Sequence, residues 1–175
     1  MKCILAAAVL AAGQAAHAGG ISFNEITPGE ALRFQASTGQ VLEHVFRGKS
    51  WGRYLVETYE LDGDARAKLF DARFDSAGRL VEIRGTDGSK IRYAPHRCTD
   101  VIGTCSYEVI LPGGSREARI QEMFEEGQRQ SITLRDNTGR ILSATEREVD
   151  ARGWTLNSSV TAGGTSVTLT RINGG

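Results

Sequence analysis

The amino-acid sequence predicts an all-β protein: an antiparallel meander of roughly ten or eleven strands, arranged as an open or partly closed sheet or as a sandwich. Two observations support this fold class. Turn-forming clusters rich in Gly, Asp and Asn recur at short intervals from residue 52 onward, and the segments between them alternate apolar and polar residues. This spacing leaves room for one strand between turns, and the alternation is typical of an antiparallel sheet with one buried face.

The turn clusters contain the residues that tight hairpins need. Gly and Asn accept the positive φ angles of two-residue turns, and an Asp side chain can accept hydrogen bonds from the backbone of its own turn. The clusters lie at residues 62–64, 75–78, 86–89, 112–115, 136–139, 150–153 and 162–164. Further strands are expected at residues 31–35, 41–47 and 52–61.

The segments between the turns carry their apolar residues at alternate positions. Side chains of one parity along a strand lie on one face of the sheet. We therefore expect the following apolar residues to face the core: Tyr107, Val109, Trp154, Leu156, Val167 and Leu169. Segment 116–126 has a composition that would also suit a helix, but its apolar residues keep strand parity and glycines bound it, so we predict a strand.

Residues 1–18 have the pattern of a secretory signal peptide. Lys2 gives a positive start, residues 3–12 form an apolar run, and small residues precede a cleavage site after Ala18. A transmembrane anchor is the alternative, but the run is half of the about 20 residues that a bilayer core needs. We expect a single β-rich domain at residues 19–175, in the periplasm or secreted by a bacterium, with no transmembrane segment after cleavage.

Charged residues are balanced and interspersed along the chain. There are 21 Lys and Arg residues and 21 Asp and Glu residues. A nucleic-acid partner is not expected, because such proteins concentrate positive charge. The basic residues are mostly arginine, which suits anion recognition but also follows from genomic composition bias. An outer-membrane barrel is disfavoured, since segment 140–148 has charges on both faces where such barrels place apolar residues toward lipid.

Cys98 and Cys105 are predicted to form a disulfide bond. They are the pair that remains after Cys3 leaves with the signal peptide, and a disulfide is the default for such a pair outside the cytoplasm. Closing so short a loop would restrict the unfolded chain by about 2.5 kcal/mol. No metal site or cofactor is expected, because the mature chain offers only His44 and His96 as histidine ligands and lacks the known phosphate- and metal-binding motifs.

Residues 48–52 match G-x-S-x-G, the nucleophile elbow of α/β-hydrolases. That motif requires a strand, a sharp turn that exposes the serine, and then a helix. The residues after Gly52 are instead rich in strand formers, so we expect a hairpin turn and do not predict Ser50 to be catalytic. No other residue is predicted to be catalytic.

Two short segments are the candidate binding surfaces. The loop at 94–105 carries His96 and Arg97 beside the predicted disulfide, and a cross-linked loop presents a rigid contact surface. Trp51 and Tyr54 lie near glycines and would provide a stacking platform for a sugar or a peptide. Aromatic residues in such a segment more often belong to the core, and this is the alternative interpretation.

Two functional classes remain open. The first is an exported binding or structural module of the bacterial cell envelope, whose partner is an unknown envelope component, protein or small ligand. It predicts a concave or flat face with aromatic residues and arginines. The second is a periplasmic or secreted hydrolase, which predicts a deep pocket that holds His44 or His96 within hydrogen-bond reach of a carboxylate or hydroxyl. The module is favoured over an enzyme, because short turns leave little loop length for a catalytic pocket.

Overall fold

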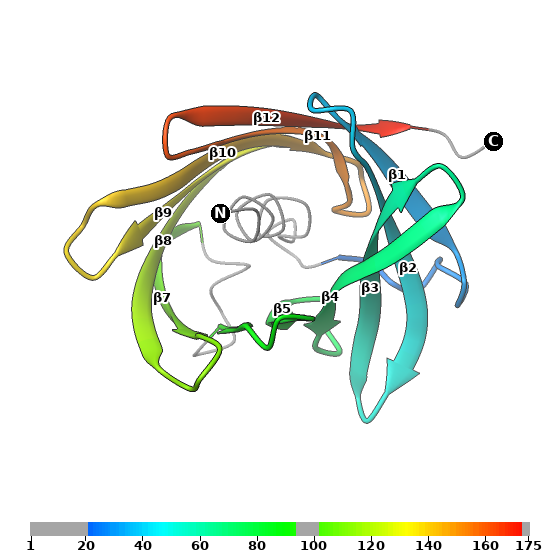
Figure 1. Ribbon diagram of the computed structural model, residues 1–175, viewed down its shortest axis with the longest axis horizontal. Helices are drawn as coiled ribbons and strands as arrows, with labels where there is room; N and C mark the ends of the chain where they lie inside the picture. The colour runs from blue at the N-terminus through cyan, green and yellow to red at the C-terminus, as the bar shows by residue number, and fades with distance from the viewer. Residues whose placement is uncertain (1–20, 94–101, 173–175) are drawn as a thin grey trace.

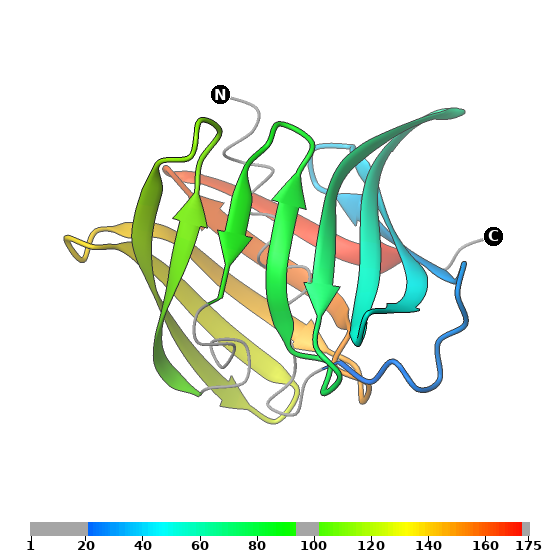
Figure 2. The ribbon, with the colours of Figure 1, turned by 90° about the horizontal axis from the view of Figure 1, so that it is seen from below.

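The computed structural model describes residues 21–93 and 102–172. In these stretches the chain forms twelve antiparallel strands that close into a barrel (Figures 1 and 2). The strands are β1 (Ala31–Ala36), β2 (Val41–Ser50), β3 (Arg53–Asp62), β4 (Ala65–Phe74), β5 (Leu80–Gly85), β6 (Lys90–Arg92), β7 (Gly103–Ile110), β8 (Arg116–Glu126), β9 (Arg129–Asp136), β10 (Ile141–Val149), β11 (Thr155–Ala162) and β12 (Thr165–Ile172). The predicted antiparallel meander is confirmed, and its sheet closes on itself.

The pairing of β1 with β12 closes the wall. Arg33 lies opposite Ile172 in this pair. The ladder continues beyond the end of β1, where the Ser37 N–H donates a 2.8 Å hydrogen bond to the Thr168 carbonyl oxygen. Closure gives partners to backbone groups that two edge strands would otherwise leave exposed.

Three of the hairpin turns are held by the same arrangement of an aspartate. In Asp75, Asp136 and Asp150, one carboxylate oxygen accepts hydrogen bonds of 2.9 to 3.1 Å from the N–H groups two and four residues further on. Glycine is required at one position in these turns. Gly78 has a φ of +76°, and a Cβ atom there would lie 2.0 Å from the carbonyl oxygen of Ile21, which crosses the turn.

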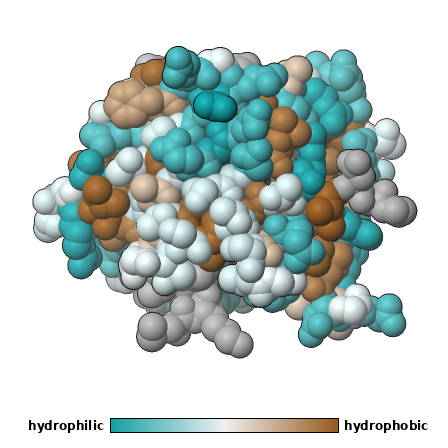
Figure 3. All heavy atoms as spheres, turned by 90° about the horizontal axis from the view of Figure 1, so that it is seen from above, coloured by the Kyte–Doolittle hydropathy of each residue, from teal (hydrophilic) through white to brown (hydrophobic). Residues whose placement is uncertain are grey.

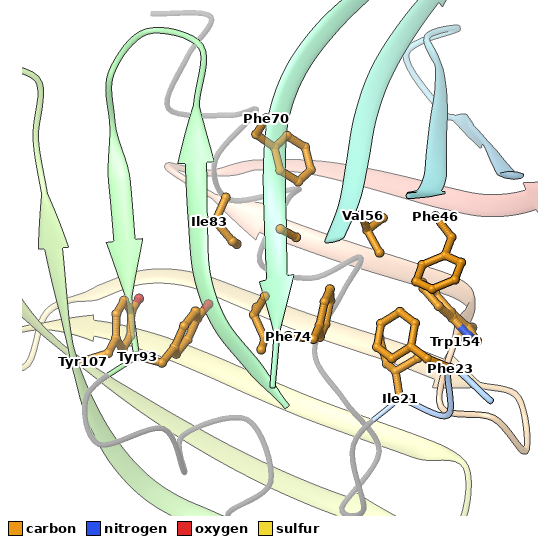
Figure 4. Close-up of a cluster of buried hydrophobic side chains, with 12 residues drawn as sticks. Ile21, Phe23, Phe46, Val56, Phe70, Phe74, Ile83, Tyr93, Tyr107 and Trp154 are labelled. Carbon is orange, nitrogen blue, oxygen red and sulfur yellow. The ribbon is translucent and has the colours of Figure 1, made fainter. Parts of the chain in front are cut away.

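The inner face of β2 to β7 is covered by aromatic and aliphatic side chains (Figure 4). They form the largest of the three hydrophobic clusters found in the described residues, and its members include Phe46, Val56, Phe70, Phe74, Ile83, Tyr93, Tyr107 and Trp154. Phe23, which precedes β1, packs into this cluster with its ring centroid 5.1 Å from that of Phe74. Burial of these large side chains is the main favourable contribution to folding.

Most of the residues predicted to face the core do so. Val109 is half-buried against the largest cluster, and four others are buried: Tyr107, Trp154, Val167 and Leu169. The prediction is wrong for Leu156, which is only half-buried and joins none of the clusters. The register between β10 and β11 shifts here, so that Glu148 pairs with Asn157 and the residue after Glu148 pairs with Thr155. Leu156 is left in a bulge, which alternation along one strand does not reveal.

Segment 116–126 is a strand, as predicted, and contributes a more polar inner wall. Gln121 and Met123 of β8 are 3% and 0% exposed, whereas Phe124 is 62% exposed on the outside. The barrel interior therefore has an apolar half on β2 to β7 and a mixed half that begins at β8.

Several predictions concern residues outside the described stretches. The signal peptide at 1–18, the candidate binding residues His96 and Arg97, and Cys98 all lie there. Cleavage after the signal peptide and the Cys98–Cys105 disulfide therefore stay predictions. In the part of the chain that the structure describes, no helix is long and apolar enough to cross a membrane.

Candidate binding site

The turn that contains the G-x-S-x-G match is a hairpin between β2 and β3. Ser50 ends β2 and pairs with Arg53 at the start of β3. The two turn residues, Trp51 and Gly52, have φ angles of 51° and 75°. Positive values at both positions are typical of a type I′ turn, which matches the twist of a hairpin. Because a strand follows the serine where a hydrolase has a helix, this is not a nucleophile elbow.

Trp51 occupies this turn at a cost to folding. Among the described residues it is the one non-glycine residue with a positive φ, and its side chain is 100% exposed. Turns of this type favour Asn or Gly, because a bulky side chain is strained at positive φ. The indole also leaves a large apolar surface in water. Among the large apolar side chains of the described residues, that of Trp51 is the most exposed.

Tyr54 has a different environment from Trp51. Its ring stacks on that of Phe23 with 4.4 Å between centroids, and the Lys49 ammonium lies 5.1 Å from the Tyr54 centroid. The half-buried Tyr54 thus supports the hairpin from inside. Trp51 and Tyr54, the two aromatic residues singled out from the sequence, border one groove; Trp51 is fully exposed there and Tyr54 is half-buried.

That groove, of about 400 Å³, lies beside the hairpin. It is lined by Ser50, Trp51, Arg53, Tyr54, Leu55 and Arg73. Leu55 and Arg73 are direct cross-strand neighbours on β3 and β4. The Nε atom of Arg73 is buried, and no group in residues 21–93 or 102–172 accepts a hydrogen bond from it. The groove therefore combines apolar surface with the guanidinium groups of Arg53 and Arg73.

Arg73 belongs to a wider group of cations around Glu82 of β5. The Nε atoms of Arg73 and Arg92 lie 3.9 and 3.5 Å from the Glu82 carboxylate oxygens. Arg84 is in closer contact with the same carboxylate. Burial would raise the pKa of Glu82, but the hydrogen bond from Arg84 and the nearby positive charges outweigh burial and lower it. Glu82 is thus ionised at neutral pH and holds several cations at once.

We define the basic patch as five of the seven cationic residues of β3 to β6, leaving out Arg66 and Lys68, which are paired with Glu43, Glu57 and Asp71. They are Arg53, Arg73, Arg84, Lys90 and Arg92. Arg84 and Lys90 lie directly opposite each other on β5 and β6, where like charges destabilise a sheet. Three of the five, Arg73, Arg84 and Arg92, share the Glu82 carboxylate. Within the described stretches, neither Arg53 nor Lys90 forms an ion pair.

The acidic residues that border the basic patch are bound to other cations. Lys68 lies 2.6 Å from Asp71, and Arg116 lies 3.1 Å from Glu108. Glu108 is the cross-strand neighbour of Arg92 and therefore reduces the positive charge at that end. The excess of positive charge is consequently greatest toward Arg53, beside the groove.

Inside the barrel, β8 to β10 hold a polar cluster in which Arg147 and Gln130 are buried and Glu125 is half-buried. Arg147, 3% exposed, donates a 2.7 Å hydrogen bond from Nε to the Gln130 side-chain oxygen, and the Gln130 amide donates a 2.5 Å bond to Glu125. Burial lowers the pKa of Arg147 to about 9, and the charge of Glu125 partly offsets this effect. These contacts satisfy buried polar groups and stabilise the inner wall.

His44 has part of the geometry that the hydrolase alternative predicts. Its Nδ1 atom lies 2.7 Å from the Thr58 hydroxyl oxygen. His44 is 4% exposed, however, and its ring centroid lies 4.9 Å from that of Phe34. Burial lowers its pKa to about 4, and the cavity beside it, of about 10 Å³, holds no more than one water. His44 is thus a buried wall residue. Its convergence with His96 stays a prediction, because His96 lies outside the described stretches.

A second groove, of about 560 Å³, lies over β10 to β12. Figure 3 shows the side of the molecule on which β12 lies in Figure 1, with residues of intermediate hydropathy gathered near its centre. Ser159, Thr168 and Thr170 contribute hydroxyl groups there, and the lining contains two arginines and two glutamates. This groove has neither an excess of charge nor an exposed aromatic residue, so it is the weaker candidate for specific binding.

Metal binding has no support from the geometry. The described residues contain no group of three or more His, Cys, Asp and Glu side chains that could hold a metal ion. The carboxylates of the outer wall bind arginine and lysine side chains, as at Glu43 and Glu57.

Comparisons with known proteins do not place the chain in a family. No protein-family model matches it, and neither does any curated protein. Its fold is similar to that of a provisionally named exported protein with a YmcC-like fold from Bacteroides fragilis, with a TM-score of 0.39, 8% identity, and coverage of 84% of this chain and 97% of that one. A hypothetical protein from Chlamydia trachomatis has a TM-score of 0.33 and 11% identity, with 83% of this chain and 86% of that one covered. Similarities this weak carry no argument about function.

The basic patch was not found from the sequence. Its residues are separated along the chain and lie on four different strands. The abundance of arginine was the one available indication, and by itself it did not separate anion recognition from composition bias. Trp51, by contrast, was selected from the sequence and borders the groove.

Proposed function

We propose that the protein is an exported, non-catalytic module of the bacterial cell envelope, which binds an anionic envelope component through the basic patch and the adjoining groove. The observation that carries this proposal is the excess of positive charge in the basic patch, where three arginines share one carboxylate and Arg53 and Lys90 form no ion pair within the described stretches. The signal-peptide pattern of residues 1–18 supports export. The exposed Trp51 and the groove beside it support binding.

A bound anion would relieve an unfavourable feature of the free protein. Arg84 and Lys90 repel each other across β5 and β6, and Lys90 has no ion-pair partner among the described residues. An anionic oxygen at these groups would accept charge-assisted hydrogen bonds, each worth about 1.5–3 kcal/mol. Trp51 and Leu55 add apolar surface to the groove. The favoured ligand therefore has an anionic group next to an apolar part.

Binding of a fluorescently labelled dextran sulfate, a soluble polyanion, tests this proposal. The double variant Arg73→Gln, Arg84→Gln should bind at least about tenfold more weakly at low salt, because two charge-assisted contacts are lost. The affinity of the unaltered protein should also fall as the salt concentration rises. Arg140→Gln is the matched control, since Arg140 is exposed, pairs with Asp136 and lies away from β3 to β6.

The Glu82→Gln variant tests the proposal through an expected gain of affinity. The substitution removes the carboxylate from the centre of the basic patch, so the affinity for dextran sulfate should rise. Glu122→Gln is the control, because Glu122 binds Arg135 on a different part of the wall. Unchanged affinity in both the double arginine variant and Glu82→Gln would contradict the proposal.

A further inference from the structure

We infer that the anionic component is the surface of a lipid bilayer, and that Trp51 is the side chain that enters the bilayer interface. This inference rests on the proposed function, because it uses the same basic patch. It adds the identity of the anionic partner and a specific role for the hairpin between β2 and β3.

The hairpin presents Trp51 in a manner suited to an interface. The turn between β2 and β3 lies at the periphery of the molecule (Figure 1), and the Trp51 side chain is fully exposed. Tryptophan is enriched at membrane–water interfaces, where its ring is apolar and its N–H can still form a hydrogen bond. A tight two-residue turn also restricts the backbone, so little conformational freedom is lost when the indole is buried in lipid.

The cations lie where lipid head groups would be when the indole is inserted. Arg53 begins the strand directly after the turn, and Arg73 lines the same groove as Trp51. Lys49, on the other side of the turn, adds a further positive charge next to Tyr54. Juxtaposed aromatic and basic residues of this kind bind anionic membranes through combined burial and charge.

The arrangement fits a bilayer better than a sugar polymer. A sugar site holds its ligand between side chains that form a concave wall with polar groups around the ring. Trp51 is instead entirely exposed, and the other aromatic residue at the groove, Tyr54, is stacked on Phe23. The charge excess lies on the wall beside the protruding indole, which matches a planar anionic surface.

Sedimentation with vesicles tests the inference. The protein should bind vesicles that contain phosphatidylglycerol and phosphatidylcholine, and should not bind vesicles of phosphatidylcholine alone. Tryptophan fluorescence gives a second measurement, because the chain has two tryptophans and Trp154 is 2% exposed. A shift of the emission to shorter wavelength on vesicle binding therefore reports on Trp51. High salt should reverse the binding.

The Trp51→Asn variant distinguishes binding to a bilayer from binding to other anions. This variant keeps the basic patch and has a residue that the turn favours, so it should fold. It should bind anionic vesicles at least about tenfold more weakly, because the interfacial anchor is lost. Its loss of affinity for dextran sulfate should be much smaller, because that polyanion has no acyl chains for the indole to enter. Phe124→Ser is the control, since Phe124 is another exposed aromatic residue but lies on β8.

Each combination of results has a distinct meaning. Binding to dextran sulfate without binding to anionic vesicles would overturn the bilayer inference and leave the proposed function standing. Equal binding to neutral and anionic vesicles, or binding without an emission shift, would also overturn it. Failure to bind both dextran sulfate and anionic vesicles would contradict the proposed function as well as the bilayer inference.

Discussion

Two regions of the same outer wall use charged residues in different ways. Around Glu43 and Glu57, on β2 and β3, cations are matched by carboxylates. Arg33 and Arg66 lie 3.0 and 2.7 Å from Glu43. Around Glu82, a short distance along the wall, three arginines of the basic patch share one carboxylate. Both regions lie on one continuous sheet, so the difference comes from the side chains and not from the backbone.

The charges of the first region stabilise the fold, and those of the second do not. Glu57 is bonded to Lys68 at 2.7 Å and to the Tyr59 hydroxyl at 2.8 Å, and Arg47 also contacts it. Such a network satisfies each member and can stabilise the wall, whereas isolated surface pairs contribute little. The surplus cations of the basic patch add repulsion instead. We therefore expect changes near Glu57 to affect stability and changes in the basic patch to affect binding.

The largest expected effect sets the scale for this comparison. Phe74 is fully buried in the inner cluster and lies next to Arg73 on β4. Phe74→Ala should lower the free energy of unfolding by about 3–5 kcal/mol, because a large buried ring is removed. Urea denaturation would measure the change. A loss below about 1 kcal/mol would mean that the inner cluster does not support this part of the wall.

The network around Glu57 should make stability sensitive to acid. Burial would raise the pKa of Glu57, but hydrogen bonds from Lys68, Tyr59 and Arg47 outweigh it and lower the pKa from 4.5 to about 2. The stabilisation is therefore complete above pH 4.5 and is lost as the pH falls toward about 2. Glu57→Gln should cost about 1–3 kcal/mol at neutral pH and remove this part of the acid dependence. Urea denaturation at a series of pH values would show it; an unchanged acid profile in the variant would contradict the assignment.

A substitution in the turn beside the basic patch should make the folded protein more stable. Trp51→Asn should raise the free energy of unfolding by about 0.5–1 kcal/mol, because asparagine tolerates the positive φ of this position better. Thermal denaturation compared with Trp51→Phe, which keeps an aromatic ring at the same φ, would isolate the effect of the backbone. A loss of stability in the asparagine variant would show that the indole supports the fold.

The smallest expected effect on stability lies in the basic patch itself. Arg73→Gln should change the free energy of unfolding by less than about 0.5 kcal/mol, because its separation of 3.9 Å from Glu82 makes a weak, partly exposed pair. Denaturation of this variant beside Glu57→Gln would test the contrast between the two regions directly. A cost as large as that of Glu57→Gln would mean that the basic patch is structural.

Much of the fold was predictable because it depends on local patterns. Asp75, Asp136 and Asp150 hold their turns through hydrogen bonds within a few residues, and the sequence alone placed these turns correctly. Leu156 was assigned to the wrong environment, since a bulge between two strands is a property of the pair. The hairpin at residues 48–52 was interpreted correctly because the strand formers that follow it exclude a helix.

The sequence by itself determined the antiparallel meander, its turns and most of the residues that face inward, because turn chemistry and side-chain alternation act over a few residues. The tertiary structure decided the closure of β1 on β12 and the gathering of Arg53, Arg73, Arg84, Lys90 and Arg92 on one face. Charges that are interspersed along the chain became adjacent only when β3 to β6 were paired in register. The register of neighbouring strands depends on contacts between segments, so no pattern within a single strand contains it.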